Sequence, residues 1–225
     1  MALGFTGIAV LSAGDIQGTV IVTHKLTRRK VTASSGAYER GSPVVLGSGA
    51  FAKDALAYER SHVVIYLDGD FPSNSTVATM DQKNREFVPD LITIPCGSTV
   101  SFPNMDPIFH NVFSLSKPKT FDLGNYAKGQ TRSVTFLKPG IVLVNCRLHT
   151  NMTGAIVVTP NQWSSIPDAD GRFELRGVPD GTHTLIAWHK AVGFLRRTVT
   201  VSDARIAIVE FPVPLDENGM ALPQR

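Results

Sequence analysis

Apolar and polar residues alternate with a period of two over short stretches of most of the chain, and β-branched residues cluster in the same stretches. This period places side chains on opposite faces of a strand, and long helical stripes with a period near 3.6 do not recur. The pattern therefore predicts an all-β protein, in sandwiches. The expected strands are 18–23, 63–67, 78–87, 91–95, 98–104, 111–114, 131–136, 141–146, 155–159, 172–176, 184–187, 196–201 and 206–211.

The spacing of these strands divides the chain into regions. Residues 15–75 hold two strands and a polar middle that includes 47–58, which is either a short helix or a loop. Residues 76–160 and 161–215 are two denser runs of strands, and 216–225 form a solvated tail. The first region is preceded by an apolar run.

Residues 1–14 are mostly apolar and end in small residues, as a signal peptide does. No Lys or Arg precedes the run, so a buried first strand is the alternative. The expectation is a signal-peptide remnant and a protein that is periplasmic or otherwise exported.

Composition narrows the class of protein. The 225 residues are 43% hydrophobic and 18% charged, which indicates a globular chain. The net charge is +3 and no basic run stands out, so we expect no nucleic-acid partner. No later stretch reaches the ~20 apolar residues of a membrane-spanning helix, so the mature chain should contain none.

The strongest chemical signal is the heptapeptide Cys146-Arg-Leu-His149-Thr-Asn-Met152, with His110 thirty-six residues before the cysteine. The predicted strand before Cys146 places it at the mouth of a sandwich, and the next residues can return over it. One thiolate, two imidazoles and a thioether suit copper that transfers electrons, whereas zinc prefers four strong ligands and rarely uses Met. Taken singly, each residue is more often a core or structural group, and Cys96 and Cys146 could instead form a disulfide.

Around these residues the chain resembles the cupredoxin family, and most of all its amicyanin-like members. The resemblance covers roughly 76–160 and includes Phe87-Val88-Pro89, Ile94, 97–104, His110-Asn111-Val112 and the short loop C-x-x-H-x-x-M. It implies a Greek-key β-sandwich with His110, Cys146 and His149 as equatorial ligands and Met152 as the axial ligand. Asn111 would be an outer residue that ties the His110 loop to the Cys146 loop. The sequence departs from the family pattern in two respects: the ligand loop contains Arg147, and it contains no Pro.

The resemblance also implies roles for residues beyond the ligands. Cys96 should be an inert thiol at the end of the sandwich opposite the copper. Members of the family expose the edge of the second histidine within an apolar docking patch, here Met105, Pro107, Ile108 and Leu148, together with Arg147. Lys117, Lys119 and Arg147 either steer an acidic partner or are simply solvated.

Residues 166–187 resemble the second half of a carboxypeptidase regulatory-like sandwich, which is transthyretin-like or prealbumin-like. The opening strands of that module occur at 18–22 and 63–67. Our hypothesis is that 15–75 and 161–215 form one discontinuous sandwich with the cupredoxin inserted, and independent sequential domains are the alternative. The acidic residues Asp168, Asp170 and Glu174 could suggest a calcium site. Because the EF-hand pattern is absent, we expect them to form a turn instead. We expect structural or surface roles for four other histidines, because none of them is spaced from another potential ligand as in a metal site: His24, His62, His183 and His189.

Together, the predicted fold and the predicted ligands indicate a function. The chain should bind one type 1 (blue) copper and act as a one-electron carrier of the cell envelope, as a monomer. It should not be an enzyme, because multicopper enzymes need further His-Cys-His and His-x-His motifs, which the sequence lacks. Proteins with this organisation are often named methylamine utilisation proteins, so the redox partner would be a c-type cytochrome or a periplasmic dehydrogenase. The alternative is copper storage without redox activity, or an adhesion module.

Overall fold

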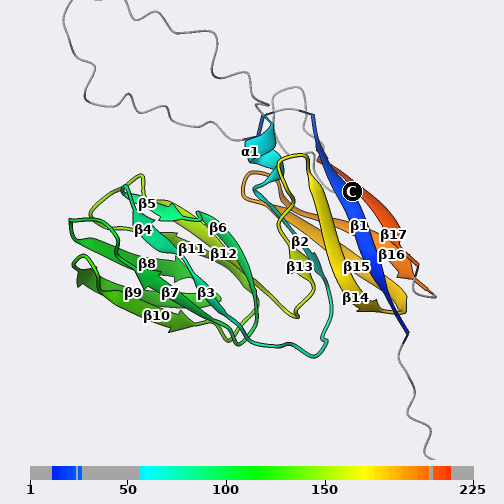
Figure 1. The fold of residues 1–225 in the computed structure, drawn as a ribbon, viewed down its shortest axis with the longest axis horizontal. Coiled ribbons are helices and arrows are strands. Elements are labelled where there is room, and N and C mark those ends of the chain that lie inside the picture. Colours follow the sequence, from blue (N-terminus) through cyan, green and yellow to red (C-terminus); the bar gives the residue numbers. More distant parts are fainter. Residues whose placement is uncertain (1–11, 24, 27–55, 203–204, 214–225) are drawn as a thin grey trace, which may run out of the picture.

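Two β-sandwiches lie side by side in the computed structural model (Figure 1). The structure describes residues 12–23, 25–26, 56–202 and 205–213, and its one helix within these ranges is α1 (Ala57–Arg60). The all-β prediction is confirmed. No helix in these ranges has the length and apolar character needed to cross a membrane. Most of the expected signal-peptide remnant, residues 47–55, the tail 216–225 and His24 lie outside the described residues.

The first sandwich is built from strands near both ends of the chain. β1 (Ala13–Val22) lies between β14 (Arg172–Pro179), to which it is antiparallel, and β17 (Ala207–Val213), to which it is parallel. The facing sheet has the order β13 (Ser164–Ser165), β2 (Val63–Leu67), β15 (Gly181–His189) and β16 (Gly193–Val201). Buried side chains of both sheets, such as Ile16, Leu67 and Val199, form its core. Strands that come before and after residues 77–159 thus share one core.

Strand β1 begins earlier than the predicted 18–23 because Ile16 already faces the core. Gly18 lies opposite Phe173 and Val209 in the two neighbouring strands. A Cβ atom at Gly18 would lie 2.3 Å from the Phe173 ring and 2.4 Å from the Val209 carbonyl oxygen. The aromatic ring therefore crosses β1 at a position where only glycine leaves room.

The second sandwich contains the segment 77–159. Its larger sheet has the order β6 (Leu91–Pro95), β12 (Thr153–Thr159), β11 (Gly140–Asn145), β8 (His110–Ser116) and β9 (Lys119–Tyr126). The facing sheet has the order β10 (Thr131–Thr135), β7 (Thr99–Pro103) and β3 (Val77–Thr79), and a ribbon of β4 (Asp81–Lys83) and β5 (Glu86–Val88) adjoins it. Phe102, Phe136, Val144 and Ile156 are fully buried in the core between them.

Two predictions in this sandwich were wrong in detail. The predicted strand 78–87 is divided into β3, β4 and β5. Asn84 and Arg85, with positive φ angles of 57° and 60°, make the tight turn between β4 and β5. The edge strand β9 was not predicted, since its residues are mostly half-buried or exposed and give a weak alternation.

The sandwiches contact each other through the outer faces of two sheets. Val64 of β2 and Trp188 of β15 pack against Leu91 of β6 and against Ala155 and Val157 of β12. Alternate residues of β12 thus face the core of the second sandwich and the neighbouring sandwich, so the strand is buried on both faces. This explains its nearly continuous apolar sequence.

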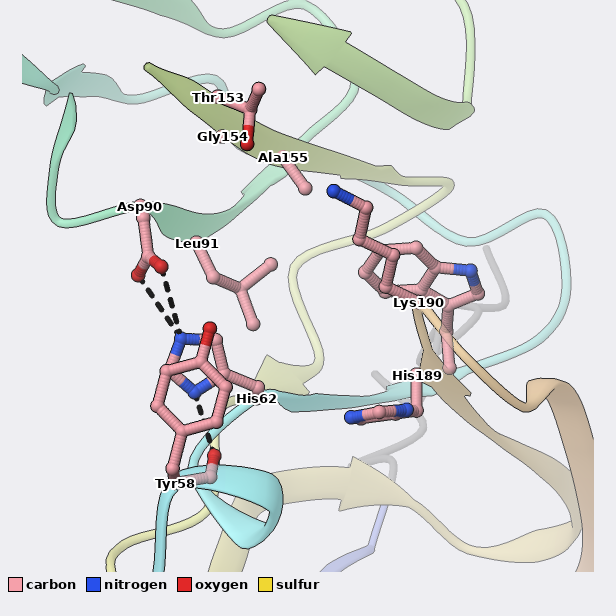
Figure 2. Close-up of a pocket in the computed structure, with 10 residues that line it drawn as sticks. Tyr58, His62, Asp90, Leu91, Thr153, Gly154, Ala155, His189 and Lys190 are labelled. Atoms are coloured by element: carbon pink, nitrogen blue, oxygen red, sulfur yellow. Dashed lines mark hydrogen bonds and ion pairs between the residues drawn. The ribbon is translucent and has the colours of Figure 1, made fainter. Parts of the chain in front are cut away.

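A hydrogen-bonded pair spans the same contact beside a cavity of about 80 Å³ (Figure 2). His62, which precedes β2, presents Nε2 to the Asp90 carboxylate at 3.1 Å, and Asp90 precedes β6. His62 Nδ1 lies 2.7 Å from the Tyr58 carbonyl oxygen. Both of these partners accept hydrogen bonds, so the protonated ring satisfies both. Burial works to lower the pKa of His62, but Asp90 and the carbonyl outweigh it and the pKa is raised.

We expect this pair to make stability depend on pH. The pKa of Asp90 is lowered by the hydrogen bond from His62 against the effect of burial. A raised histidine pKa stabilises the fold below pH 6.5, and a lowered aspartate pKa stabilises it above pH 3.8. The stabilisation is therefore complete between these values, is lost as the pH rises through the folded-state pKa of His62, and is lost as it falls through that of Asp90.

The measurement is the thermal midpoint of Asp90→Asn against the wild type from pH 3 to pH 9. The wild-type advantage should be about 1–3 °C near pH 5, the size of a partly exposed ion pair in a chain of this length. It should shrink at both extremes. Asp70→Asn, at an exposed carboxylate, is the control. A difference that stays constant across this range would contradict the prediction.

Candidate metal centre

The four predicted ligands lie at the start of β8 and in the loop that follows the neighbouring strand β11. His110 is the first residue of β8, and Cys146 directly follows β11. His149 and Met152 lie in the loop from β11 to β12. The Met152 amide donates to the His149 carbonyl at 3.0 Å and the Cys146 amide donates to the Met152 carbonyl at 3.1 Å. These two bonds fold the loop back on itself, so the short spacing returns both residues to the end of β11.

Three donor atoms meet at this end of the sandwich. Cys146 Sγ lies 3.9 Å from His110 Nδ1 and 3.7 Å from His149 Nδ1, and all three atoms lie within 4.8 Å of one another. A metal about 2.0–2.3 Å from imidazole nitrogen and thiolate sulfur leaves about 3.5–4 Å between such ligands. The spacing therefore fits one ion bound by all three side chains, and no other group of this kind occurs in the described part of the chain.

Burial differs among the ligands in a way that suits a closed centre with one accessible edge. His110 and Met152 are completely buried, Cys146 is nearly so, and His149 is half-buried. Burial, His110 and Arg85 hold the pKa of His149 below its ordinary value, although Asp106 opposes them. The ring is therefore neutral near pH 7 and can offer a nitrogen lone pair to a metal.

Asp106 was not among the predicted site residues, yet it orients the first ligand. Its Oδ2 atom lies 2.8 Å from His110 Nε2, so the other ring nitrogen, Nδ1, faces Cys146. Its two oxygens also accept from the Asn84 amide at 2.7 Å and the Arg85 amide at 2.8 Å. A carboxylate behind a metal-binding histidine fixes the ring and raises its basicity.

The electrostatics agree with an ionised Asp106. Burial works to raise the pKa of this carboxyl group, but the Arg85 amide, His110 and the Asn84 amide together lower it. The residue is four positions before His110 in a loop. No strand or helix period connects the two there, so no sequence pattern indicated the contact.

Asn111, predicted to tie the two ligand loops together, lies between them. Its backbone amide donates to Cys146 Sγ at 3.5 Å. Its side chain donates to Asp122 of β9 at 2.7 Å, and Arg147 donates to the same carboxylate. Asp122 is a further residue that sequence reasoning missed, because β9 was not predicted.

The predicted docking residues are mostly exposed to solvent. Met105, Pro107 and Leu148 are exposed and Ile108 is half-buried. Phe109, which was not predicted, is 59% exposed and directly precedes the predicted ligand His110. Exposed large apolar side chains from the 105–109 segment and from the ligand loop therefore occur in the same part of the sequence as the metal ligands.

Cys96 lies at the other end of the sandwich from Cys146. Its amide donates to Thr159 at the end of β12, and β12 pairs with β11 so that Thr153 is opposite Asn145 and Val158 is opposite Gly140. The two cysteines are therefore separated by the length of β11, and both are free thiols, as predicted.

Comparisons with known proteins gave matches only among solved structures. No family model matches the chain, and no curated protein matches it. Cupredoxins and a copper-containing nitrite reductase are among the solved structures that are similar to part of it. A Cu-containing nitrite reductase from Thermus scotoductus SA-01 is 26% identical with a TM-score of 0.36, over 40% of this chain and 24% of that one.

Two smaller proteins match over nearly their whole length. A purple cupredoxin from Nitrosopumilus maritimus is 22% identical with a TM-score of 0.33, over 36% of this chain and 99% of that one. Amicyanin from Paracoccus versutus is 22% identical with a TM-score of 0.35, over 42% and 96%. With TM-scores this low, the description of the fold and of the donor cluster rests on the strand pairing and donor distances of this chain.

Proposed function

We propose that this chain binds a single copper ion through His110, Cys146, His149 and Met152 and acts as a one-electron carrier. The observation that supports it most is the convergence of two imidazole Nδ1 atoms on a buried cysteine sulfur, 3.9 and 3.7 Å away. A His₂Cys set with a thioether nearby is the donor set of blue-copper electron-transfer sites. Bound copper would supply the one-electron chemistry.

The chain's own residues would keep the site similar in both oxidation states. His110 is fixed by Asp106, and the ligand loop is closed by its own backbone hydrogen bonds. Buried ligands with fixed partners change little on electron transfer, which keeps the reorganisation small. The half-buried His149 would be the route for electrons, and the exposed apolar residues Met105, Phe109 and Leu148 would contact the partner.

The remaining parts of the proposal rest on the sequence. The carrier would be monomeric and exported, would catalyse no reaction of its own, and would exchange electrons with a c-type cytochrome or a periplasmic dehydrogenase. The first sandwich would be a regulatory-like, prealbumin-like module that carries the copper domain as an insertion between β2 and β13. Its strand pairing supports this, because within the described ranges β1 and β2 pair only with strands beyond residue 163.

The test is to load the purified protein with copper and record its visible spectrum. We expect an intense blue band from thiolate-to-Cu(II) charge transfer, one copper per chain, and reversible loss of the band on reduction by a c-type cytochrome. Bound copper without the band would reject a type 1 centre. A blue protein that no cytochrome or chemical reductant can cycle would favour storage over electron transfer.

A further inference from the structure

We infer that Arg147 and Asp122 form a clamp that positions the Asn111 amide against Cys146 sulfur and so sets the reduction potential of the centre. The inference rests on the proposed function and goes further, because it assigns a positioning role to a residue expected to dock a partner and to a carboxylate that the sequence did not single out.

The clamp connects the two segments that carry the ligands. Arg147, next to Cys146, donates to Asp122 Oδ2 from Nε at 3.2 Å and from Nη2 at 2.9 Å. The other oxygen, Oδ1, accepts from Asn111 Nδ2 at 2.7 Å and from the Gly124 amide at 2.8 Å. One carboxylate thus joins the residue after the cysteine ligand to the residue after the first histidine ligand.

Local strand geometry brings these groups together. The pairing of β8 with β9 shifts register between Asn111 and Phe113, and Phe113 pairs with Asp122. Such a bulge re-aims side chains near a functional site. The Arg147 guanidinium lies 4.6 Å from the centre of the Phe113 ring, so the planar group contacts an aromatic face as well as the carboxylate.

Asn111 depends on this carboxylate for its orientation. The residue is 1% exposed, and its Oδ1 atom has no hydrogen-bond partner among the described residues. Its side chain is therefore held through Nδ2 on Asp122. The backbone amide of the same residue donates to Cys146 Sγ at 3.5 Å, an ordinary length for a hydrogen bond to sulfur. A displacement of Asn111 away from Cys146 would lengthen and weaken that bond.

The hydrogen bond to sulfur has a predictable electronic effect. A donor to the thiolate withdraws electron density from it, which favours Cu(I) over Cu(II) and raises the reduction potential. Loosening the clamp should lengthen the N–H···S contact and lower the potential. The same change raises the energy of the sulfur lone pair, so the charge-transfer band should shift to longer wavelength.

Two variants test the clamp without changing the net charge near the copper. The double variant Asp122→Asn/Arg147→Gln removes the ion pair and keeps the side-chain sizes similar, while Arg147→Lys keeps the charge and loses the planar fork. The matched control is Glu174→Gln/Arg176→Gln in the first sandwich. There Glu174 also accepts from an arginine and from an amide, Gln17, at 2.9 Å.

The readouts are the reduction potential and the band position of the copper-loaded protein. In a fixed redox buffer the double variant should shift the Cu(I)/Cu(II) ratio about threefold to tenfold toward Cu(II), or about 30–60 mV at 59 mV per tenfold. Arg147→Lys should shift it less in the same direction, and the control should match the wild type. All variants should bind one copper.

The outcomes separate this inference from the proposed function. A wild-type protein without the blue band would reject the proposed function itself. A blue wild type whose two variants keep the control's potential, or show a higher one, would overturn the clamp. A shift in the double variant with none in Arg147→Lys would also overturn it, because the arginine fork would then have no part in positioning Asn111.

Discussion

Replacing Cys146 with serine is expected to abolish the visible absorption of the copper-loaded protein completely. Cys146 Sγ is the atom toward which His110 Nδ1 and His149 Nδ1 both point, at 3.9 and 3.7 Å. The band arises from electron transfer between thiolate sulfur and Cu(II), and a serine oxygen provides no equivalent orbital. Copper affinity should also fall by at least about tenfold, or about 1.4 kcal/mol, because a neutral hydroxyl replaces an anionic ligand.

Cys96→Ser is the matched control for this experiment. It changes the chain's other free thiol, which lies at the opposite end of the same sandwich. It should leave the band, the copper stoichiometry and the affinity unchanged. Spectra and copper titrations of the two variants are compared at equal protein concentration. An unchanged band in Cys146→Ser, or a lost band in Cys96→Ser, would show that the copper centre is not the one described.

Replacing Asp106 with asparagine is expected to weaken copper binding about tenfold to 100-fold, the usual cost of losing the carboxylate behind a metal-binding histidine. The carboxylate accepts from His110 Nε2 and from the two amides of the Asn84-Arg85 turn. An asparagine presents one acceptor and one donor group in their place. One or more of these donors then faces an NH₂ group, so His110 is free to turn away from Cys146.

Without copper, Asp106→Asn should lower the free energy of unfolding by about 1–3 kcal/mol, since buried donors are left without acceptors. Asp168→Asn is the control, because Asp168 also accepts two backbone amides, those of Asp170 and Arg172, in a turn far along the chain. It should leave copper affinity unchanged. Isothermal titration with copper and urea unfolding of the copper-free protein measure both effects. Equal copper affinity in the two variants would remove Asp106 from the site.

The sequence predicted the ligands because the relevant contacts are mostly local. His149 and Met152 follow Cys146 within one short loop, which closes through backbone hydrogen bonds among these three residues. The strands β11 and β12, which flank the loop, could also be predicted. Buried and exposed residues alternate in β11, and β12 is almost continuously buried. His110 lies far from the other three ligands in the sequence, so spacing alone did not single it out. It was identified because the residues around it resemble a cupredoxin motif.

The groups that support the ligands could not be predicted in this way. Asp106 lies in a loop, and its contacts with the Asn84-Arg85 turn join residues more than 20 positions apart. Neither residue of that turn is glycine, so its positive φ angles gave no sequence signal. Asp122 lies on a half-exposed edge strand whose alternation is weak.

By itself, then, the sequence determined the all-β class, the apolar strands and the set of donor atoms, because each depends on side-chain chemistry at short or regular spacing. The tertiary structure decided which carboxylates stand behind these donors, how β1 pairs with strands from the far end of the chain, and where the two sandwiches meet. Those features depend on contacts between residues distant in sequence. Such contacts are fixed by the packing of whole sheets, through strand register and burial, and short patterns along the chain do not contain them.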